Sequence, residues 1–492
     1  MRWQSARAGI LQVTALAAVL SLGGIHEASR QTCLTNIANG DFWWHLRVGL
    51  GILQTQAVPH FGLYSQASPL PWMASSWLYD VVIAIGYRMM GLRIVLLTAI
   101  LFRFALAFVV FVLAGGFRGR FWIAIVLSLL AQYILGNLQP LPLCYSILAL
   151  SIELALLTEC HTACSVKPLY WLPCLFLLWA NVDVEFVCGV IALMLFAASC
   201  CINAWVLHPN VSAGARTETL SLKRVGVLTV MSLAATVVTP YGWSPYATFF
   251  SQVTSAANSY LPNYQSLRFR TPQDYVLLLL IMTAFLALGM RRSRDPFQIG
   301  LLVFMTMIGF RAQRDLWLPT LAAIATLANA IPQSNWPTVR ASAWRGATSA
   351  GVALTVLLLA MKSFGPSDNE AALARMDKRF PVAAADYIRE RHLPQPLFNS
   401  YQWGGFLIWY LPEYPVAVDA RSDLYGADFD IQYAKVMNAD AHYSTFAPLN
   451  QARTILLEKD SLMGEALSNV AGFTVAYSDD VAVVLLRQEQ QQ

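Results

Sequence analysis

Long apolar runs separated by short polar segments fill the first two thirds of the chain. A helix that crosses a bilayer needs roughly 17–25 apolar residues, and several runs approach that length. They cover residues 8–27, 93–115, 121–137, 142–158, 170–186, 187–206, 225–240, 273–290, 296–311, 315–332 and 346–362. The shorter runs are expected to be tilted or partly re-entrant. The pattern predicts an α-helical polytopic membrane protein with about eleven spans.

The segment Trp77–Met90 decides how these spans are oriented. It is too short to span comfortably and carries Asp80 and Arg88, so we expect an interfacial helix there. Basic residues of the connecting segments then fall on one side of the membrane, which the positive-inside rule assigns to the cytoplasm. They are Arg2, Arg7, Arg118, Arg120, Lys167, Arg216, Lys223, Arg224, Arg291, Arg292, Arg294, Arg340 and Arg345.

The first apolar run has two interpretations. Arg2 and Arg7 precede it and small residues follow it, as in a cleaved signal peptide. The run is longer than the usual core of such a peptide and lacks a clean A-x-A site. An uncleaved first helix with a cytoplasmic N-terminus is therefore predicted.

This topology places the polar residues of several helix ends on the extracytoplasmic face. They are Asp41, Gln139, Pro140, Asn181, Asp183, Glu185, Tyr241, Gly242, Trp243, Arg311 and Arg314. Their convergence on one face predicts a functional site that faces the periplasm or the cell exterior.

The composition changes after Phe364, where charges become frequent and apolar runs shorten. We expect residues 1–365 to form a membrane domain, with residues 28–92 as its first external loop. Residues 366–492 are predicted to form a small soluble extracytoplasmic α/β domain. Its expected helices are Ala383–Arg391, Trp403–Leu411, 427–438 and 461–469, and its expected strands are Val416–Asp419, Thr454–Glu458, Phe473–Tyr477 and Val481–Leu486.

The composition supports a membrane protein. Of the 492 residues, 57% are hydrophobic and 12% charged, with a mean hydropathy of +0.51, whereas soluble proteins carry about 25% charged residues. The net charge of +5 lies in short clusters between apolar runs, so no nucleic-acid partner is implied. Cys160 and Cys164 have no second pair nearby, which favours reduced thiols over a zinc site. The sequence contains no Walker loop, G-x-S-x-G elbow, H-E-x-x-H or Rossmann glycine motif, which argues against nucleotide hydrolysis.

The segment Gly40–Arg47, which follows the first apolar run, contains a carboxylate, aromatic rings, an imidazole and a guanidinium within eight residues. Tryptophan suits the membrane interface, but the charged groups need another reason. Asp41, partly desolvated by the indoles, could act as a general base. It could also be an N-cap of the helical pattern that follows, and the two roles are compatible. We expect Trp44, His45 and Arg47 to help bind substrate.

Charged residues at three other places also have two interpretations. Asp183 and Glu185 could present carboxylates to Mg²⁺ or Mn²⁺, or they could simply be exposed acids. Arg311 and Arg314 could hold a phosphate by bidentate hydrogen bonds, or they could snorkel to lipid headgroups. In the soluble domain the segment Asp419–Asp423 could lie at a ligand site at a strand end or form a turn network. Within the spans, an ion pair between Arg103 and Glu153 would explain both charges.

These residues resemble a known group. The first loop (Asp41 to Arg47, Pro59, Tyr64-Ser65, Pro71-Trp72 and Trp77-Leu78) is similar to that of bacterial membrane proteins with the GT-C glycosyltransferase fold, including protein O-mannosyltransferases and aminoarabinose transferases. The similarity continues through Trp179-Ala180-Asn181, Pro240 to Trp243, Phe398 to Gly405 and Val418 to Tyr425.

The resemblance implies an inverting transfer of a sugar from a polyprenyl-phosphate donor, outside the cytoplasm, by a protein of the bacterial inner membrane. Asp41 would be the base that activates the acceptor, and Arg311 and Arg314 would meet the lipid phosphate. A divalent cation could serve as a cofactor, and the resemblance implies no particular oligomeric state.

The chain also departs from the group. Related sequences often have an acid at the positions of Gln139, Gly62 and Ser76 of this chain. They commonly have a histidine at the position of Asp183, and an acidic-aromatic pair where this chain has Asn263-Tyr264. A non-catalytic protein that binds lipid-linked glycan or organises envelope glycan assembly is therefore the alternative. A secondary transporter fits the span count, but the sequence has no internal repeat.

Overall fold

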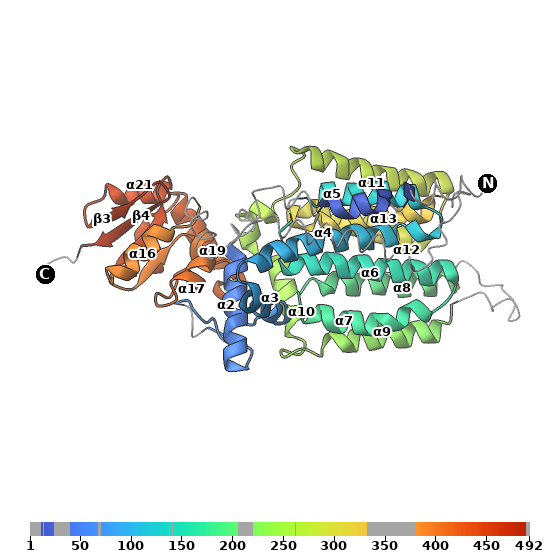
Figure 1. Ribbon diagram of the computed structural model, residues 1–492, viewed down its shortest axis with the longest axis horizontal. Helices are drawn as coiled ribbons and strands as arrows, with labels where there is room; N and C mark the ends of the chain where they lie inside the picture. Colours follow the sequence, from blue (N-terminus) through green and yellow to red (C-terminus); the bar gives the residue numbers. More distant parts are fainter. Residues whose placement is uncertain are drawn as a thin grey trace, which may run out of the picture. The chain divides into compact units, whose positions relative to one another are not determined.

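The computed structural model describes residues 11–12, 14–23, 40–66, 70–136, 138–139, 141–204, 220–260, 262–331 and 379–488. These residues are mostly helical, with a small sheet near the C-terminus (Figure 1). Contacts between residues divide the chain into two compact units. Unit 1 comprises Met1–Arg30, Leu97–Phe249 and Pro262–Phe364, and unit 2 comprises Gln31–Leu96, Phe250–Leu261 and Gly365–Gln492. The expected span 346–362, Pro140 and the basic residues Arg2, Arg7, Arg216, Arg340 and Arg345 lie outside the described residues.

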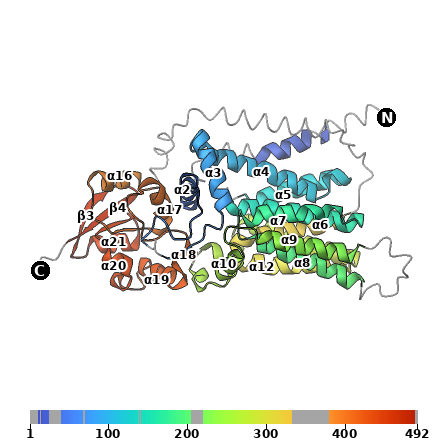
Figure 2. The same ribbon diagram turned by 90° about the horizontal axis from the view of Figure 1, so that it is seen from below.

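Unit 1 is a bundle of apolar helices that lie side by side in both views (Figures 1 and 2). Its helices are α4 (Arg93–Leu113, which begins in unit 2), α5 (Phe121–Ile134), α6 (Pro142–Ala163), α7 (Leu172–Ala180), α8 (Phe186–Ile202), α9 (Leu222–Thr236), α11 (Pro272–Arg291), α12 (Pro296–Arg311) and α13 (Trp317–Ala330). Short 3-10 turns η2 (Gly116–Arg118), η3 (Lys167–Trp171), η7 (Pro262–Tyr264) and η8 (Gln313–Asp315) connect some of them. Helix α10 (Ser244–Thr254) joins the two units in sequence.

Three helical segments among the described residues are long and apolar enough to cross a membrane: Arg93–Arg118, Pro142–Ala163 and Pro272–Arg291. They correspond to the expected spans 93–115, 142–158 and 273–290. Thr14–Gly23, Phe121–Ile134, Phe186–Ile202 and Pro296–Arg311 are apolar but shorter. The number of about eleven spans stays a prediction.

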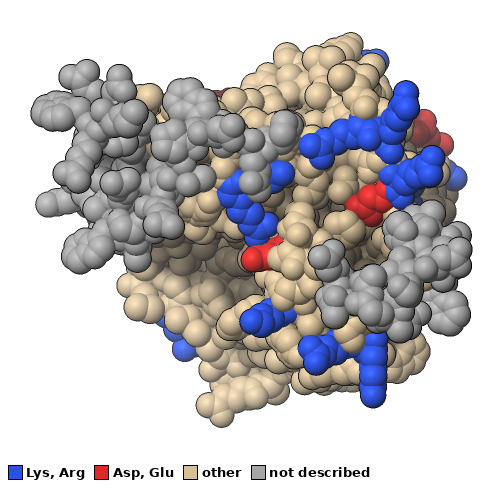
Figure 3. All heavy atoms as spheres, turned by 90° about the vertical axis from the view of Figure 1, so that its right-hand side faces the viewer, with Lys and Arg blue, Asp and Glu red and all other residues tan. Residues whose placement is uncertain are grey.

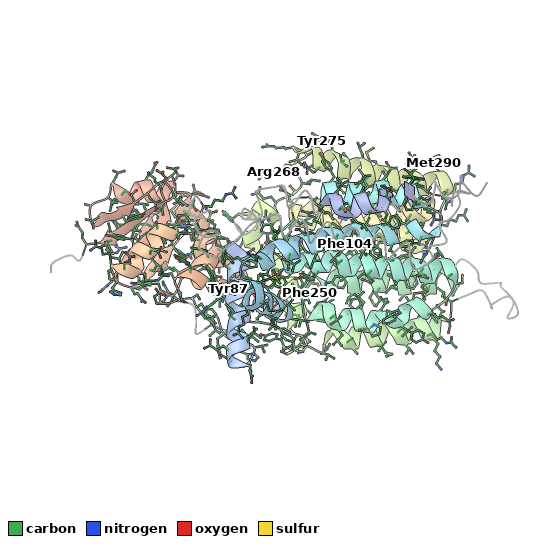
Figure 4. The ribbon with its side chains drawn as sticks, viewed as in Figure 1. Tyr87, Phe104, Phe250, Arg268, Tyr275 and Met290 are labelled. Carbon is green, nitrogen blue, oxygen red and sulfur yellow. The ribbon has the colours of Figure 1, made fainter. Side chains whose placement is uncertain are left out.

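Helix α11 shows which surface of the bundle is apolar. Tyr275, Leu279, Met282, Leu286 and Met290 are each more than half exposed, and their spacing of three to four residues puts them on one face of the helix. Tyr275 and Met290, labelled in Figure 4, lie toward opposite ends of α11. An exposed apolar stripe of this kind is what contact with lipid requires.

Basic side chains gather at the end of unit 1 where α4, α6 and α11 finish (Figure 3). Burial, together with the charges of Arg291 and Arg118, lowers the pKa of Arg120, so these three arginines lie near one another. Arg118 also forms an ion pair with Glu159 near the C-terminal end of α6, at 2.7 Å. Arg118, Arg120 and Arg291 were expected on one side of the membrane by the positive-inside rule, and they lie near one another at one end of unit 1.

Unit 2 combines the first loop of the sequence with the C-terminal segment. From the first loop come α2 (Gly40–Thr55) and α3 (Trp77–Met90). The C-terminal helices are α16 (Val382–Glu390), α17 (Tyr401–Tyr410), α18 (Ser422–Tyr425), α19 (Ala427–Met437), α20 (Ala447–Gln451) and α21 (Leu462–Ser468), with the 3-10 turn η9 (Tyr443–Thr445). The 3-10 turn η6 (Ala256–Ser259) belongs to the short middle segment Phe250–Leu261. Val48, Trp72, Ala74 and Leu424 share one apolar cluster, so the loop and the C-terminal segment have a common core.

A four-stranded mixed sheet lies within unit 2, with the strand order β1-β2-β4-β3. Its strands are β1 (Leu397–Asn399), β2 (Thr454–Glu458), β3 (Phe473–Ser478) and β4 (Ala482–Arg487). The first pair is parallel and the other two are antiparallel. Three of the four expected strands and all four expected helices agree with these elements to within a few residues.

The expected strand Val416–Asp419 was wrong, and β1 was missed. Val416 forms only an isolated bridge to Ser65. The Asn399 side chain replaces a neighbouring strand, because its Oδ1 accepts from the Ala417 amide at 2.9 Å and its Nδ2 donates to the Val418 carbonyl at 2.8 Å. The β-branched run therefore packs in the core without joining the sheet.

Candidate functional site

Asp41 is the second residue of α2 and lies in its first turn. The expected N-cap role is wrong in this detail, because α2 begins at Gly40 and Asp41 is already helical. A carboxylate in this turn is favoured by the partial positive charge at a helix N-terminus. Burial and the Asp41 charge together raise the pKa of the Tyr401 phenol, so α2 and α17 bring these two polar groups close to one another.

His45 lies one turn beyond Asp41 and is held on three sides. Its Nδ1 is 2.6 Å from Oδ1 of Asp80 on α3. The imidazole stacks on the Trp44 indole with ring centres 3.5 Å apart and meets the Tyr79 ring edge-on at 5.1 Å. His45 and Asp80 are both buried. From the sequence, Asp80 was recognisable only as a charge that makes Trp77–Met90 a poor span.

Trp44 and Arg47 lie beside the same loop of unit 2. The Trp44 ring meets Trp72 edge-on at 6.0 Å, and the Arg47 guanidinium carbon lies 5.0 Å from the centre of the Tyr64 ring. Neither Nε1 of Trp44 nor Nε of Arg47 has a hydrogen-bond partner among the described residues. Their role in binding substrate stays a prediction.

The segment Asp419–Asp423 forms a turn network, and the ligand-site interpretation loses its premise because Val416–Asp419 is not a strand. Asp419 accepts hydrogen bonds from Nε and Nη2 of Arg421, both at 2.8 Å, and from the Tyr425 hydroxyl at 2.7 Å. Burial opposes ionisation of Asp419, but the Arg421 charge and these hydrogen bonds outweigh it and lower its pKa. Trp72 covers the guanidinium, 4.8 Å from its ring centre. The network is a buried structural tie.

Unit 1 contains a second polar cluster, centred on Arg314. Its Nη2 forms a close ion pair with Oε1 of Glu185, and its Nη1 donates a short hydrogen bond to the Tyr264 hydroxyl. Its Nε lies 3.6 Å from Oδ1 of Asp315. The cluster joins the turn before α8, the η7 turn and the η8 turn, so three connections distant in sequence meet there.

Asp183 extends this cluster toward α6. Its Oδ2 accepts a hydrogen bond from the Ser146 hydroxyl at 2.6 Å, and the Ser146 oxygen in turn accepts from Nε1 of Trp179 at 2.7 Å. Burial and the nearby Glu185 charge raise the pKa of Asp183 to about 7. The same two causes raise the pKa of Asp315 to about 7. The cluster therefore holds protons near neutrality.

The structure thus brings together Asp183, Glu185 and Arg314 of the expected site residues. The carboxylates are engaged with Ser146 and Arg314, and among the described residues no group of three His, Cys, Asp or Glu side chains is arranged to hold a metal ion. The expected exposure of the two acids is wrong, since both are buried.

The remaining expected residues have other surroundings. Asn181 ends α7, where its Nδ2 donates to the carbonyls of Leu177 at 2.8 Å and Val238 at 3.0 Å, which ties α7 to the end of α9. Tyr241 follows α9 in a turn in which its amide donates to Thr239 at 3.3 Å. Arg311 is the exposed last residue of α12. Its positive charge favours ionisation of Asp315, but burial and the Glu185 charge have the larger effect, so the pKa of Asp315 is still raised.

The expected ion pair between Arg103 and Glu153 is absent. Arg103 donates to the carbonyls of Leu135 at 2.7 Å and Gly136 at 2.5 Å, which lack helical partners because α5 has ended. Both carboxyl oxygens of Glu153 lack a hydrogen-bond partner among the described residues. The guanidinium of Arg103 therefore binds carbonyl groups at the end of α5 and not the carboxylate of Glu153.

Sequence reasoning missed Ser146, Tyr264 and Asp315 as members of the Arg314 cluster. Asp315 follows Arg314 directly, and that adjacency of opposite charges at a helix end was a usable signal. Tyr264 stands where the resemblance expected an acidic-aromatic pair. Ser146, four residues beyond Pro142 in an apolar run, gave no signal.

No family model and no curated protein matches the chain. Among solved structures it is similar to the archaeal oligosaccharyltransferase AglB from Archaeoglobus fulgidus, solved in complex with an inhibitory peptide and a dolichol-phosphate. The identity is 12% and the TM-score 0.49, over 93% of this chain and 69% of that one. It is also similar to the arabinofuranosyltransferase AftD from Mycobacteria, with 13% identity and a TM-score of 0.41 over 100% of this chain and 40% of that one.

The two names are those of an oligosaccharyltransferase and an arabinofuranosyltransferase. Likeness at this level assigns no activity, which has to be inferred from the residues of the chain itself.

Proposed function

We propose that this chain is a membrane glycosyltransferase that moves a sugar from a polyprenyl-phosphate donor to an acceptor on the extracytoplasmic face. The observation that carries the proposal is the Arg314 cluster. It contacts α6 through Ser146, near the N-terminal end of that helix, whereas Glu159 near the other end pairs with Arg118. Buried charges at membrane helices are costly and usually mark a substrate or ion site. Such a cluster opposite the basic end of the bundle fits an outward-facing site.

The proposed reaction breaks the bond between the sugar C1 and the donor phosphate oxygen. A new bond forms between C1 and the acceptor oxygen on the opposite face of the sugar. The acceptor proton goes to the Asp41 carboxylate, and polyprenyl phosphate leaves. Arg311 would bind the phosphate, and Arg314 would join it by exchanging its contacts with Tyr264 and Asp315 for phosphate oxygens while Glu185 keeps Nη2 in place. Trp44, His45 and Arg47 would contact the sugar or the acceptor.

The first test is Asp41→Asn in the purified full chain. The donors are polyprenyl phosphates that carry single hexoses or pentoses, and release of polyprenyl phosphate is measured with water or free sugars as acceptors. A lost general base should lower turnover by about 10²–10⁴-fold, while asparagine preserves the shape of the helix start. The control is Asp440→Asn, an exposed carboxylate in unit 2. Full activity in Asp41→Asn would remove its catalytic role.

The second test concerns the phosphate. Arg314→Lys keeps the charge but loses the planar fork, so binding of polyprenyl phosphate should weaken. Arg268→Lys, at an exposed arginine of the same unit labelled in Figure 4, is the matched control. Equal weakening in both variants would contradict a specific role for Arg314. Tight binding by a wild-type chain that transfers no sugar would favour the non-catalytic, glycan-binding alternative.

The third test concerns the membrane topology. Reporter fusions after Arg294 and after Gly365 should report the cytoplasmic and the outer side, respectively. Both fusions reporting the cytoplasm would contradict the interfacial placement of Trp77–Met90.

A further inference from the structure

His45 and Asp80 form a buried dyad whose chemistry the proposed reaction does not use. The nitrogen Nδ1 of His45 lies 2.6 Å from Oδ1 of Asp80, and their side chains are 6% and 0% exposed. The second oxygen of Asp80, Oδ2, has no hydrogen-bond partner among the described residues. Burial raises the pKa of Asp80, against the opposing effects of the charge and hydrogen bond of His45.

The local sequence explains why the two side chains meet. A Cβ atom on Gly49 would lie 2.0 Å from the Asp80 carbonyl oxygen and 2.9 Å from Cβ of Ala84. Only glycine therefore lets α2 approach α3 this closely. His45 precedes Gly49 by one helical turn, and Asp80 precedes Ala84 by one turn. The close approach of the backbones places the imidazole against the carboxylate.

A purely structural role accounts poorly for this pair. Two helices in contact are joined at lower cost by apolar side chains, because a buried carboxylate loses its hydration and Oδ2 recovers no hydrogen bond. His45 also shares a face of α2 with Asp41, since residues four apart are neighbours on a helix surface. Trp44 and Tyr79 flank the imidazole and shield it from water.

We propose that Asp80 is a positioning residue that fixes the tautomer of His45, with Nδ1–H donated to Asp80 and Nε2 left as a hydrogen-bond acceptor on the face of Asp41. Nε2 then accepts a hydrogen bond from a hydroxyl of the sugar or the acceptor. This assignment of the substrate contact rests on the proposed glycosyl transfer. The tautomer itself does not depend on it.

Two isosteric variants separate the contact from a structural tie. In His45→Asn the amide nitrogen takes the place of Nδ1 and keeps the bond to Asp80, but Nε2 is lost. In His45→Gln the amide reaches the place of Nε2, but Asp80 loses its partner. We expect His45→Asn to melt near the wild-type temperature and to lose roughly 10- to 100-fold in turnover. His45→Gln should melt earlier and retain more turnover per folded molecule. If His45→Asn instead kept more turnover than His45→Gln, so that turnover followed stability, the substrate contact would be overturned.

The tautomer is tested without any substrate. Histidine labelled with ¹⁵N in the full-length protein gives separate NMR signals for protonated and unprotonated ring nitrogens. The His45 signals are identified by their absence in His45→Asn. Wild type should show a protonated Nδ1 and an unprotonated Nε2, and Asp80→Asn should mix or invert the two forms. A protonated Nε2 in wild type would overturn the proposal, whereas a wild type that turns over no donor but shows the expected tautomer would count only against the glycosyl transfer.

Discussion

Replacing Asp183 by asparagine should make the protein less sensitive to pH. The carboxylate of Asp183 is buried beside Glu185, and its Oδ2 accepts from the Ser146 hydroxyl at 2.6 Å. Asparagine keeps an oxygen that can accept this hydrogen bond and removes the negative charge. The variant therefore isolates the cost of ionising a carboxyl group at this position.

The size and sign of the effect follow from the raised pKa. Burial and the Glu185 charge move the Asp183 pKa from its ordinary value of 3.8 to about 7. Between these values the folded protein keeps the proton and the unfolded chain has lost it, so stability falls as pH rises from about 4 to about 7 and then levels off. At 1.36 kcal/mol per pKa unit, the full effect is roughly 4 kcal/mol. This free energy is an upper figure for Asp183 alone, because the same Glu185 charge also raises the pKa of Asp315 and its effect is shared between the two acids.

Thermal unfolding in detergent, followed by tryptophan fluorescence between pH 4 and pH 8.5, measures the effect. Wild type should lose stability as the pH rises. Asp183→Asn should match it near pH 4 and exceed it above pH 7. Asp440→Asn, which removes an exposed carboxylate, controls for the general loss of charge. A gap between Asp183→Asn and wild type that stays constant with pH would refute the raised pKa and the electrostatic account of the cluster.

Three substitutions test other features by the same melting assay. Arg421→Lys should cost about 2–4 kcal/mol, since the buried Asp419 loses a bidentate partner, and a loss below about 1 kcal/mol would contradict the structural tie. Gly405→Ala should destabilise by about 1–3 kcal/mol, because the new Cβ would lie 1.9 Å from the Gly40 carbonyl oxygen; unchanged melting would show that α17 does not pack on the start of α2 in this way. Glu153→Gln should leave stability unchanged or raise it, since the carboxyl has no described partner, and a clear loss would reveal a partner.

Much of the fold was predictable because hydrophobic periodicity is a local property. Helix α3 has the expected bounds Trp77–Met90, and β2 has the expected bounds Thr454–Glu458. The expected strand Val416–Asp419 failed because a β-branched run shows that a segment is buried but does not show what pairs with its backbone. Here the Asn399 amide is that partner, and its choice depends on contacts that sequence spacing does not encode.

The candidate site was predictable in its charged members but not in their partners. Asp183, Glu185 and Arg314 were recognisable because charge at the end of an apolar run is unusual. Their partners Ser146 and Tyr264 are ordinary residues for their segments, and only the packing of the bundle brings them within reach. Arg103 shows the converse, because the expected acid was available in sequence but helix-end carbonyls bound the guanidinium.

Two buried arginine–carboxylate groups among the described residues differ in the number of acids around the arginine. Arg421 meets Asp419 with both side chains almost fully buried and the pKa of that acid lowered, while burial raises the pKa of its second acid neighbour, Asp423, to about 6. Arg314 lies among three carboxylates, of which Asp183 and Asp315 have raised pKa values. Both arginines therefore have more buried acids around them than one guanidinium can neutralise, and the Arg314 group has the larger excess. The excess acid leaves groups that exchange protons near neutral pH, and a substrate that brings a charge or a hydroxyl can exploit them.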